Sequence, residues 1–523
     1  METPLTPLEF GRRARRLYPH REAVVDGELR LTYAQLLDRC DQWSAALQRL
    51  GVKPGDRVAY IAPNTHAQLE SFYAVPQTGA VLVPINYRLT ADDFAYIIEH
   101  CGASVLCVHS DYLDTVDSVR DRLASVRHFV ALEGAKDNWL DYERLLADAP
   151  RHFEKPAIAE TDLLTINYTS GTTARPKGVM ITHRNAWMNT VGTMLHVHMT
   201  PAERYLWTLP MFHANGWTFT WTVTAAGGTH VCLRRVEAAR IFEAMRAEAI
   251  TMICAAPTVL IAVANASPEL RKDVPRGIRV LTAGAPPAAA TIARIEGDLG
   301  WDVLQVYGLT ETAPFITVCE PRTEHAALSS DERAVIKARQ GVELVTSGEL
   351  NVVSEDGSEV PHDGQTLGEI VVRGNVVMKG YYNDPEATAQ AMRGGWFHTG
   401  DAAVLHPDGY AEIRDRIKDV IISGGENISS VELEGTLLRH PAVQEVAVVG
   451  VPSEKWGESP HAFVVLRAGV SASADELREL CRSKLAHFKT PQHFTFLAEL
   501  PKTATGKIQK FVLRKRQAAI SKQ

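Results

Sequence analysis

The chain has 523 residues, of which 45% are hydrophobic and 22% are charged. These are globular values, and the length predicts a large domain with subdomains, or two or more domains. The net charge of −7 argues against nonspecific nucleic-acid binding as the main task.

From about Leu31 to Gly308, short apolar runs alternate with helical patterns. The run "RVAYIAP", for example, is followed by the helical pattern "HAQLESFYAVPQTGA" and then by the apolar run "VLVPIN". This rhythm is typical of β-α-β units. It predicts mostly parallel sheets flanked by helices, and so a large α/β domain.

Small hydroxyl residues, a glycine and one lysine follow an apolar segment in "NYTSGTTARPKGV", residues 167–179. A strand that ends in such a loop exposes backbone N–H groups and hydroxyls, which suit the oxyanions of a nucleotide. Pro176 replaces the second glycine of the Walker A order, so the loop is not that motif. The alternative is a flexible surface loop. The candidate phosphate ligands are Thr169, Ser170, Gly171, Thr172, Thr173 and Lys177.

Residues 249–266, "AITMICAAPTVLIAVANA", are apolar enough to suggest a membrane helix. Polar residues and Pro257 interrupt the segment, however. A buried strand at 250–255 followed by a helix that begins at Pro257 explains it better. The first residues contain no continuous apolar stretch of the signal-peptide kind. The seven cysteines form no CxxC pair, which argues against a zinc ribbon or a thioredoxin-like motif. Because their number is odd and no signal peptide is predicted, we expect reduced thiols in a cytoplasmic protein without membrane insertion.

The pattern changes after about Gly341, where short β-type runs with turn residues predict a β-rich subdomain. After about Arg416 it becomes mixed, and we expect a small C-terminal α+β domain. The expected division is therefore residues 1–415 and residues 416–523. The elements predicted in the second part are a helix at 430–439, strands at 443–451 and 462–466, and a helix at 473–487.

Several short motifs occur in a fixed order along the chain. They are "YTSGTTARPKG", "PMFHANGW", "AGAPP", "VYGLTET", "GWFHTGD", "DRIKDVIISGGENIS" and "PKTATGKIQK". Together they resemble the AMP-forming adenylate-forming superfamily, which includes acyl-CoA synthetases, luciferases and the adenylation domains of peptide synthetases. The resemblance spans nearly the whole chain. One departure is Ala174, where the family usually has glycine, and it affects the details of the phosphate loop.

The resemblance implies a carboxylic acid that is activated by ATP and then transferred to a thiol. It assigns Lys507 to the acid carboxylate and the α-phosphate, where a single mobile cation suits developing negative charge. Thr310 would contact the α-phosphate. Glu311 would bind Mg²⁺, because a carboxylate beside a triphosphate needs a hard cation between them. Thr169 is a weaker metal candidate. Without the motif order, Lys507 would be only a solvated base in a basic tail.

The same resemblance implies a binding site for the ribose and adenine of ATP. Asp401 and Arg416 would bind the ribose hydroxyls, since two vicinal donors suit one carboxylate. Without the family context, a turn-capping aspartate and a surface ion pair would explain these two residues. The expected adenine contacts are Tyr307, Gly284 and Ala285, and Gly308 and Pro286 beside them are further candidates for binding ATP or AMP.

For the second half-reaction, the resemblance places a hinge at Lys418. A rotation of the C-terminal domain would replace the Lys507 loop by the "SGGENIS" loop, where Gly424, Gly425 and Glu426 would bind CoA. The expected acyl pocket is formed by His213, Trp217, Trp221 and Thr282. The resemblance also makes His213 a catalytic candidate that would gate the carboxylate or shape the thiol route, and the alternative is a structural histidine. The two tryptophans suggest a restricted pocket for a short- to medium-chain or aryl acid.

We therefore predict an ATP-dependent acyl-CoA ligase that uses ATP, Mg²⁺ and CoA. Its partners would be small molecules and not nucleic acid, with a homodimer left open. The alternatives are a fatty acyl-AMP ligase that loads a carrier protein, a long-chain acyl-CoA synthetase and a luciferase-like oxidase. A catalytically inactive adenylate-binding protein would be expected to lack Lys507, Glu311 or Asp401, and all three are present.

Overall fold

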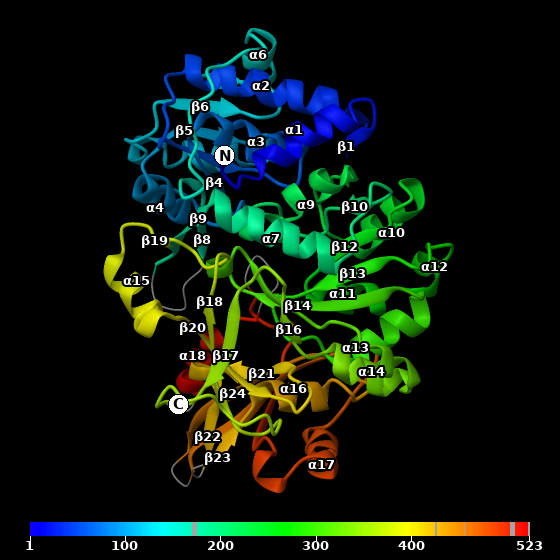
Figure 1. The fold of residues 1–523 in the computed structure, drawn as a ribbon. Coiled ribbons are helices and arrows are strands. Elements are labelled where there is room, and N and C mark those ends of the chain that lie inside the picture. Colours follow the sequence, from blue (N-terminus) through cyan, green and yellow to red (C-terminus); the bar gives the residue numbers. More distant parts are fainter. Residues whose placement is uncertain (170–174, 424–425, 454–455, 503–507, 521–523) are drawn as a thin grey trace.

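The computed structural model describes residues 1–523 except 170–174, 424–425, 454–455, 503–507 and 521–523 (Figure 1). The described residues form four sheets. Two large sheets with helices around them make up most of the first 345 or so residues. A four-stranded sheet follows, and the last sheet belongs to the C-terminal part, at the opposite end of the molecule from α2 (Tyr33–Arg49) (Figure 1). The predicted α/β class with a small α+β end is confirmed.

The first large sheet has nine strands, with parallel strands in the middle and antiparallel strands at both edges. In spatial order its strands are β16 (Val342–Glu343), β15 (Phe315–Val318), β14 (Asp302–Gly308), β13 (Arg279–Thr282), β12 (Met252–Ala255), β10 (Arg204–Leu206), β11 (Thr229–Val231), β1 (Glu22–Asp26) and β2 (Leu29–Thr32). Because β13 and β14 are parallel neighbours, their carboxyl ends lie together.

The second large sheet has eight strands and is also parallel in its centre. In spatial order its strands are β19 (Gly380–Tyr381), β9 (Lys177–Thr182), β8 (Leu163–Thr169), β4 (Val81–Ile85), β3 (Arg57–Ile61), β5 (Ala103–Val108), β6 (His128–Ala131) and β7 (Leu140–Asp141). One buried core joins the two sheets and includes Tyr60 of β3 and Tyr205 of β10.

Threonine caps begin three of the long helices in this part. In α2, α4 and α7 the threonine hydroxyl accepts a hydrogen bond from the third helical residue, whose side chain bonds back to the threonine N–H. The helices are α1 (Leu8–Leu17), α2, α3 (His66–Ala74), α4 (Ala91–Cys101), α5 (Leu113–Asp117), α6 (Tyr142–Ala147), α7 (His183–His196), α8 (Ala214–Trp217), α9 (Phe219–Ala226), α10 (Ala238–Ala247), α11 (Pro257–Ala264), α12 (Pro268–Arg271), α13 (Ala289–Arg294), α14 (Ser330–Lys337) and α15 (Pro385–Ala391).

The apolar segment 249–266 folds as the sequence predicts. It forms the buried strand β12 and then α11, whose first residue is Pro257. Within the described residues, no helix is long and apolar enough to cross a membrane. All seven cysteines are free thiols, as expected.

The predicted β-rich subdomain is an antiparallel sheet of β17 (Glu349–Val353), β18 (Gly368–Arg373), β20 (Phe397–Leu405) and β21 (Ala411–Arg416). The last sheet contains β23 (Glu426–Ile428), β22 (Ile421–Ser423), β25 (Gly457–Leu466), β24 (Val443–Ser453) and β26 (His493–Phe496). It is accompanied by α16 (Ser430–Leu437), α17 (Ala474–Lys484) and α18 (Lys510–Ile520). Ser473 caps α17, as predicted.

Candidate active site

A carboxylate, a hydroxyl and a cation from three distant segments meet beside the phosphate-loop sequence. Thr169 ends β8 and pairs with Lys177, the first residue of β9. The Nζ atom of Lys177 lies 4.9 Å from the ring centre of Tyr381 and 3.5 Å from Asp384 Oδ2. The Tyr381 hydroxyl donates to Glu311 Oε1 over 2.9 Å. The structure therefore brings together the predicted metal ligand and the predicted phosphate cation.

Tyr381 was missed by the sequence reasoning. It is placed by β19, which pairs with β9 so that Tyr381 lies opposite Val179, about two hundred positions earlier in the chain. The backbone N–H of Met378 also donates to the Glu311 carbonyl over 2.8 Å. Burial and the neighbouring Glu311 raise the pKa of Tyr381, so its hydroxyl stays protonated and can donate.

The predicted ribose ligands form a compact cluster with Tyr307. Asp401 on β20 pairs in register with Arg416 on β21, and Arg416 Nε lies 2.7 Å from Asp401 Oδ1. The Tyr307 hydroxyl donates to the other carboxylate oxygen over 2.6 Å. Arg416 is half-buried. Burial alone would lower the pKa of Arg416, but Asp401 and Tyr307 raise it. The guanidinium is therefore held charged beside the carboxylate.

The expected adenine contacts lie at the adjacent carboxyl ends of β13 and β14. Gly284 and Ala285 are exposed, and Gly284 has a φ of +90°, which favours glycine. Gly308 is required by packing, because a Cβ there would lie 1.8 Å from the Pro314 carbonyl oxygen. Pro286 is partly buried beside them.

The expected acyl-pocket segment contains a strained turn. Directly after His213, residues 214–218 all have positive φ, between 38° and 66°. Four of the five are not glycine, and left-handed backbone costs such residues about 1–2 kcal/mol each. The turn carries Trp217, whose Cζ2 atom lies 4.0 Å from the position a Cβ on Gly284 would take. Trp217 also packs edge-on against Phe315, with ring centres 5.8 Å apart.

The other two acyl-pocket candidates are buried. Trp221 packs edge-on against Phe72 of α3, with ring centres 5.9 Å apart. Thr282 ends β13, one residue before Ala283. Among the described residues, Trp221 Nε1 and Thr282 Oγ1 have no hydrogen-bond partner.

Several predicted residues lie outside the described part of the chain. They are Ser170, Gly171, Thr172, Thr173, Gly424, Gly425 and Lys507. Of the remaining candidates, Glu426 is exposed at the start of β23 and Lys418 is exposed just after β21. Thr310 and Glu311 are half-buried in a 3₁₀ turn after β14.

The predicted hinge lies next to contacts that join β21 to α16. Asp415 Oδ2 accepts hydrogen bonds from the Ser430 backbone N–H over 2.8 Å and from its hydroxyl over 2.5 Å. Arg514 of α18 forms an ion pair with Asp419 over 2.5 Å. Lys418 therefore lies between Asp415, which is hydrogen-bonded to the first residue of α16, and Asp419, which is paired with α18.

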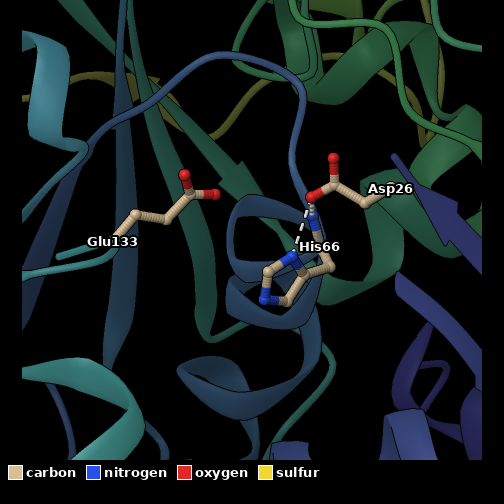
Figure 2. Close-up of side chains that lie close together, drawn as sticks. All are labelled: Asp26, His66 and Glu133. Carbon is tan, nitrogen blue, oxygen red and sulfur yellow. Dashed lines mark hydrogen bonds and ion pairs between the residues drawn. The ribbon is translucent and has the colours of Figure 1, made fainter. Parts of the chain in front are cut away.

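A different group of residues has the composition of a metal site. Asp26, His66 and Glu133 offer ligand atoms within 4.8 Å of one another (Figure 2). Arg234 already bonds both carboxylates, however, over 3.1 Å to Asp26 Oδ1 and 2.8 Å to Glu133 Oε2. A guanidinium thus supplies the positive charge, and we assign no metal here.

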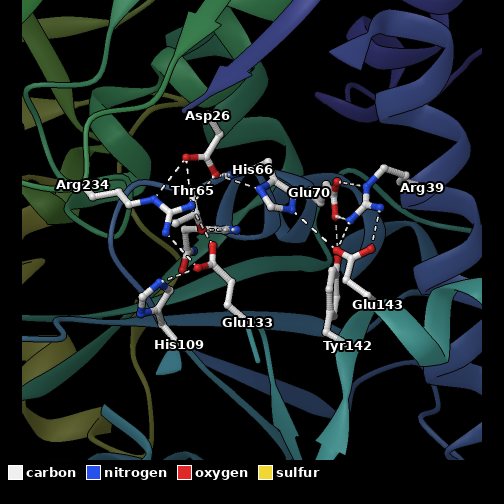
Figure 3. Close-up of polar contacts among 11 residues, drawn as sticks. Asp26, Arg39, Thr65, His66, Glu70, His109, Glu133, Tyr142, Glu143 and Arg234 are labelled. Carbon is white, nitrogen blue, oxygen red and sulfur yellow. Dashed lines mark hydrogen bonds and ion pairs between the residues drawn. The ribbon is translucent and has the colours of Figure 1, made fainter. Parts of the chain in front are cut away.

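These residues belong to a network that links the two large sheets (Figure 3). Asp26 ends β1 of the first sheet, whereas His66 begins α3, which follows β3 of the second. His66 Nδ1 lies 2.8 Å from Asp26 Oδ2, and its Nε2 lies 3.6 Å from Glu143 Oε1. Burial lowers the pKa of His66, but hydrogen bonds to Asp26 and Glu143 outweigh it and raise the pKa to about 9.

This raised pKa predicts a pH-dependent contribution to stability. A protonated His66 stabilises the fold fully below its ordinary pKa of 6.5, and the contribution is lost as pH rises through about 9. The change is up to about 3 kcal/mol. Urea midpoints at pH 6 and pH 9.5 should therefore differ less in His66→Asn than in the parent. The exposed His362→Asn variant should follow the parent. Equal pH dependence of parent and His66→Asn would refute the assignment.

The chain is similar to known proteins over almost its whole length. The sequence profile of the AMP-binding enzyme family matches residues 11–382, and that of the AMP-binding enzyme C-terminal domain matches residues 432–507. A trans-cinnamate:CoA ligase of Petunia hybrida is 40% identical, covering 98% of this chain and 94% of the relative. A 4-hydroxybutyrate–CoA ligase of Metallosphaera sedula is 42% identical, with the same coverage.

Solved structures of CoA ligases also match this fold. The crystal structure of an anthranilate CoA ligase in complex with anthranoyl-AMP matches with a TM-score of 0.90 at 26% identity, covering both chains completely. A benzoate CoA ligase from Burkholderia xenovorans matches with a TM-score of 0.86 at 25% identity, covering 97% of this chain and 99% of that one. The chain belongs to the AMP-binding enzyme family, within the AMP-forming adenylate-forming superfamily. It is an acid–thiol ligase of the acyl-CoA synthetase type.

Proposed function

We propose that the enzyme joins a short-chain or aryl carboxylic acid to CoA in two steps at one site. In the first step, a carboxylate oxygen attacks the α-phosphate of ATP, and diphosphate leaves. In the second, the CoA sulfur attacks the carbonyl of the acyl-adenylate, and AMP leaves. Activation is needed because the leaving group of a free carboxylate would be oxide.

The observation that carries this proposal is the bond between Tyr307 and Asp401. This hydrogen bond holds Asp401, the proposed ribose ligand, at the end of β14, only a few residues before Thr310 and Glu311. The end of β14 thus sets the separation between the proposed nucleoside-binding carboxylate of Asp401 and the carboxylate of Glu311, which is bonded to Tyr381. Such preorganisation favours a nucleotide that lies across both, because little reorganisation is left for the reaction itself.

We assign the metal-binding role to Glu311, with the Thr169 hydroxyl as a second ligand. A carboxylate oxygen fits the preference of Mg²⁺ for hard oxygen ligands, and Tyr381 holds the Glu311 side chain in place through Oε1. When bound, the ion would offset the charge of the phosphates. Thr310 would contact the α-phosphate, and Lys507 would contact the acid carboxylate and the α-phosphate.

The second step is assigned to a rotated arrangement of residues 416–523 about Lys418. Lys507 must leave the carbonyl before a thiol can enter, so one small domain that carries both the Lys507 segment and the Glu426 segment suits an exchange of the two. Gly424 and Gly425 precede Glu426 and are proposed to border the pantetheine path.

The acid is proposed from the relatives and from Trp217. The relatives' names include cinnamate, 4-hydroxybutyrate, acetate, butyrate and benzoate as substrates. A bulky indole at the expected pocket suits such compact acids better than long chains. We further propose a cytosolic enzyme, which its seven free cysteines favour.

A two-stage assay tests the proposal. Purified protein is incubated with ATP, Mg²⁺ and a panel of acids from acetate to cinnamate and palmitate, and diphosphate release is measured. CoA is then added, and AMP and acyl-CoA are measured. We expect CoA-dependent product with short or aryl acids. Diphosphate release without CoA consumption would favour the acyl-AMP ligase, and activity on palmitate alone would favour the long-chain enzyme.

A further inference from the structure

The strained turn at residues 214–218 is held by a closed ring of three buried hydrogen bonds. The Thr165 hydroxyl donates to Asn167 Oδ1 over 2.7 Å, Asn167 Nδ2 donates to Asn215 Oδ1 over 3.0 Å, and Asn215 Nδ2 donates to Thr165 Oγ1 over 2.9 Å. All three side chains are at least 96% buried. Each side chain therefore donates one hydrogen bond and accepts one within the ring, as buried polar groups require.

The ring connects two parts of the proposed active site. Thr165 and Asn167 lie on β8, the strand that ends at Thr169 and leads into the phosphate-loop sequence. Asn215 is the second residue of the left-handed turn, with φ 50° and ψ 48°. Asn167 Nδ2 also donates to the Phe212 carbonyl over 3.3 Å, at the residue before His213. The side chains of β8 are thus bonded to Phe212 and to Asn215, which lie on either side of His213.

The backbone beyond Asn215 is fixed from other sides as well. The Thr220 hydroxyl donates to the Asn215 carbonyl over 3.1 Å, and the hydroxyls of Thr190 and Thr218 bond over 2.8 Å. A Cβ on Gly216 would lie 2.5 Å from the Trp207 ring. A left-handed run of this length persists only where its surroundings determine it, and such strain is found most often at functional sites.

We propose that the ring of Thr165, Asn167 and Asn215 is a positioning device that determines which acid the enzyme accepts. This inference rests on the proposed function. The ring fixes the turn, the turn fixes the indole of Trp217 beside Gly284, and the indole limits the room for the acyl group. The three ring residues position this wall of the pocket, and nothing in the argument requires them to touch the acid.

Asn215→Gly tests this directly, because glycine accepts a positive φ without strain while the amide is lost. Thr165→Val is a second variant, since it removes the hydroxyl but keeps a β-branched side chain in a strand. The matched control is Asn138→Gly, an exposed asparagine at φ 65° on the surface. The probes are hydrolysis-resistant acyl-sulfamoyl adenosines that carry a butyryl or a benzoyl group, and their Kd values are measured by calorimetry.

We expect both ring variants to change the ratio of the two Kd values by about ten-fold, the discrimination an apolar pocket wall can supply. The Kd of ATP and the ratio in Asn138→Gly should stay as in the parent. The double variant Asn167→Ala with Asn215→Gly should change the ratio no more than Asn215→Gly alone, because both changes break one ring.

An unchanged ratio in both ring variants, even with both Kd values raised together, would overturn the inference and leave a structural role only. Failure of the parent itself to bind either analogue would instead refute the proposed function, and the inference with it. The two failures are therefore distinguishable.

Discussion

Replacing Glu311 by glutamine is expected to lower the rate of adenylate formation by about 10²–10³-fold, through loss of the charge that holds the metal ion. Glutamine keeps an oxygen that can accept the Tyr381 hydrogen bond, so the local fold should persist. Diphosphate release should be measured over a Mg²⁺ titration, in which the variant needs more metal than the parent.

The control for this prediction is Glu349→Gln, the same change at an exposed residue of β17 that forms an ion pair with Arg373 of β18. It should leave both the rate and the Mg²⁺ dependence unchanged. A Glu311→Gln variant with parental Mg²⁺ dependence would show that the metal lies elsewhere, whatever its overall rate.

Lys507→Ala is expected to lower adenylation by about 10²–10³-fold, because a positioned cation is lost where negative charge develops. Conversion of a supplied acyl-adenylate with CoA should be preserved, since Lys507 is proposed to have left the carbonyl by then. The two half-reactions should be measured separately, by diphosphate release and by acyl-CoA formation from the adenylate.

Lys502→Ala is the matched control, because Lys502 lies in the same motif and forms an ion pair with Glu445 over 2.6 Å. It should leave both half-reactions intact. Equal loss of both half-reactions in Lys507→Ala would contradict the proposed exchange of loops.

Much of the candidate site could be predicted because its residues lie in short motifs at strand ends. Asp401 and Arg416 were expected together, and antiparallel pairing of β20 with β21 confirms their proximity. Tyr381 and the ring of Thr165, Asn167 and Asn215 were not expected. Tyr381 depends on an edge strand that pairs across a long sequence separation, and no local pattern specifies such pairing.

The left-handed turn at residues 214–218 could not be predicted from the sequence for a different reason. Within "HANGWT" only Asn215 and Gly216 readily adopt positive φ, and neither predicts that Ala214, Trp217 and Thr218 do so as well. Tertiary hydrogen bonds override the local preference of the backbone there.

The fold was predictable where periodicity was strong, and less so at element ends. The strand and helix within residues 249–266 were expected and are present as β12 and α11. The helix expected at 473–487 ends earlier, at Lys484, after which the chain turns and forms a 3₁₀ turn at His487–Lys489. Helix ends depend on capping contacts that periodicity does not report.

The most direct test of the account is a crystal structure of the enzyme with a non-hydrolysable ATP analogue and Mg²⁺. We predict ribose hydroxyls on Asp401 and Arg416, and triphosphate oxygens near Lys177 with the metal on Glu311. Nucleotide bound away from both Asp401 and Glu311 would contradict it.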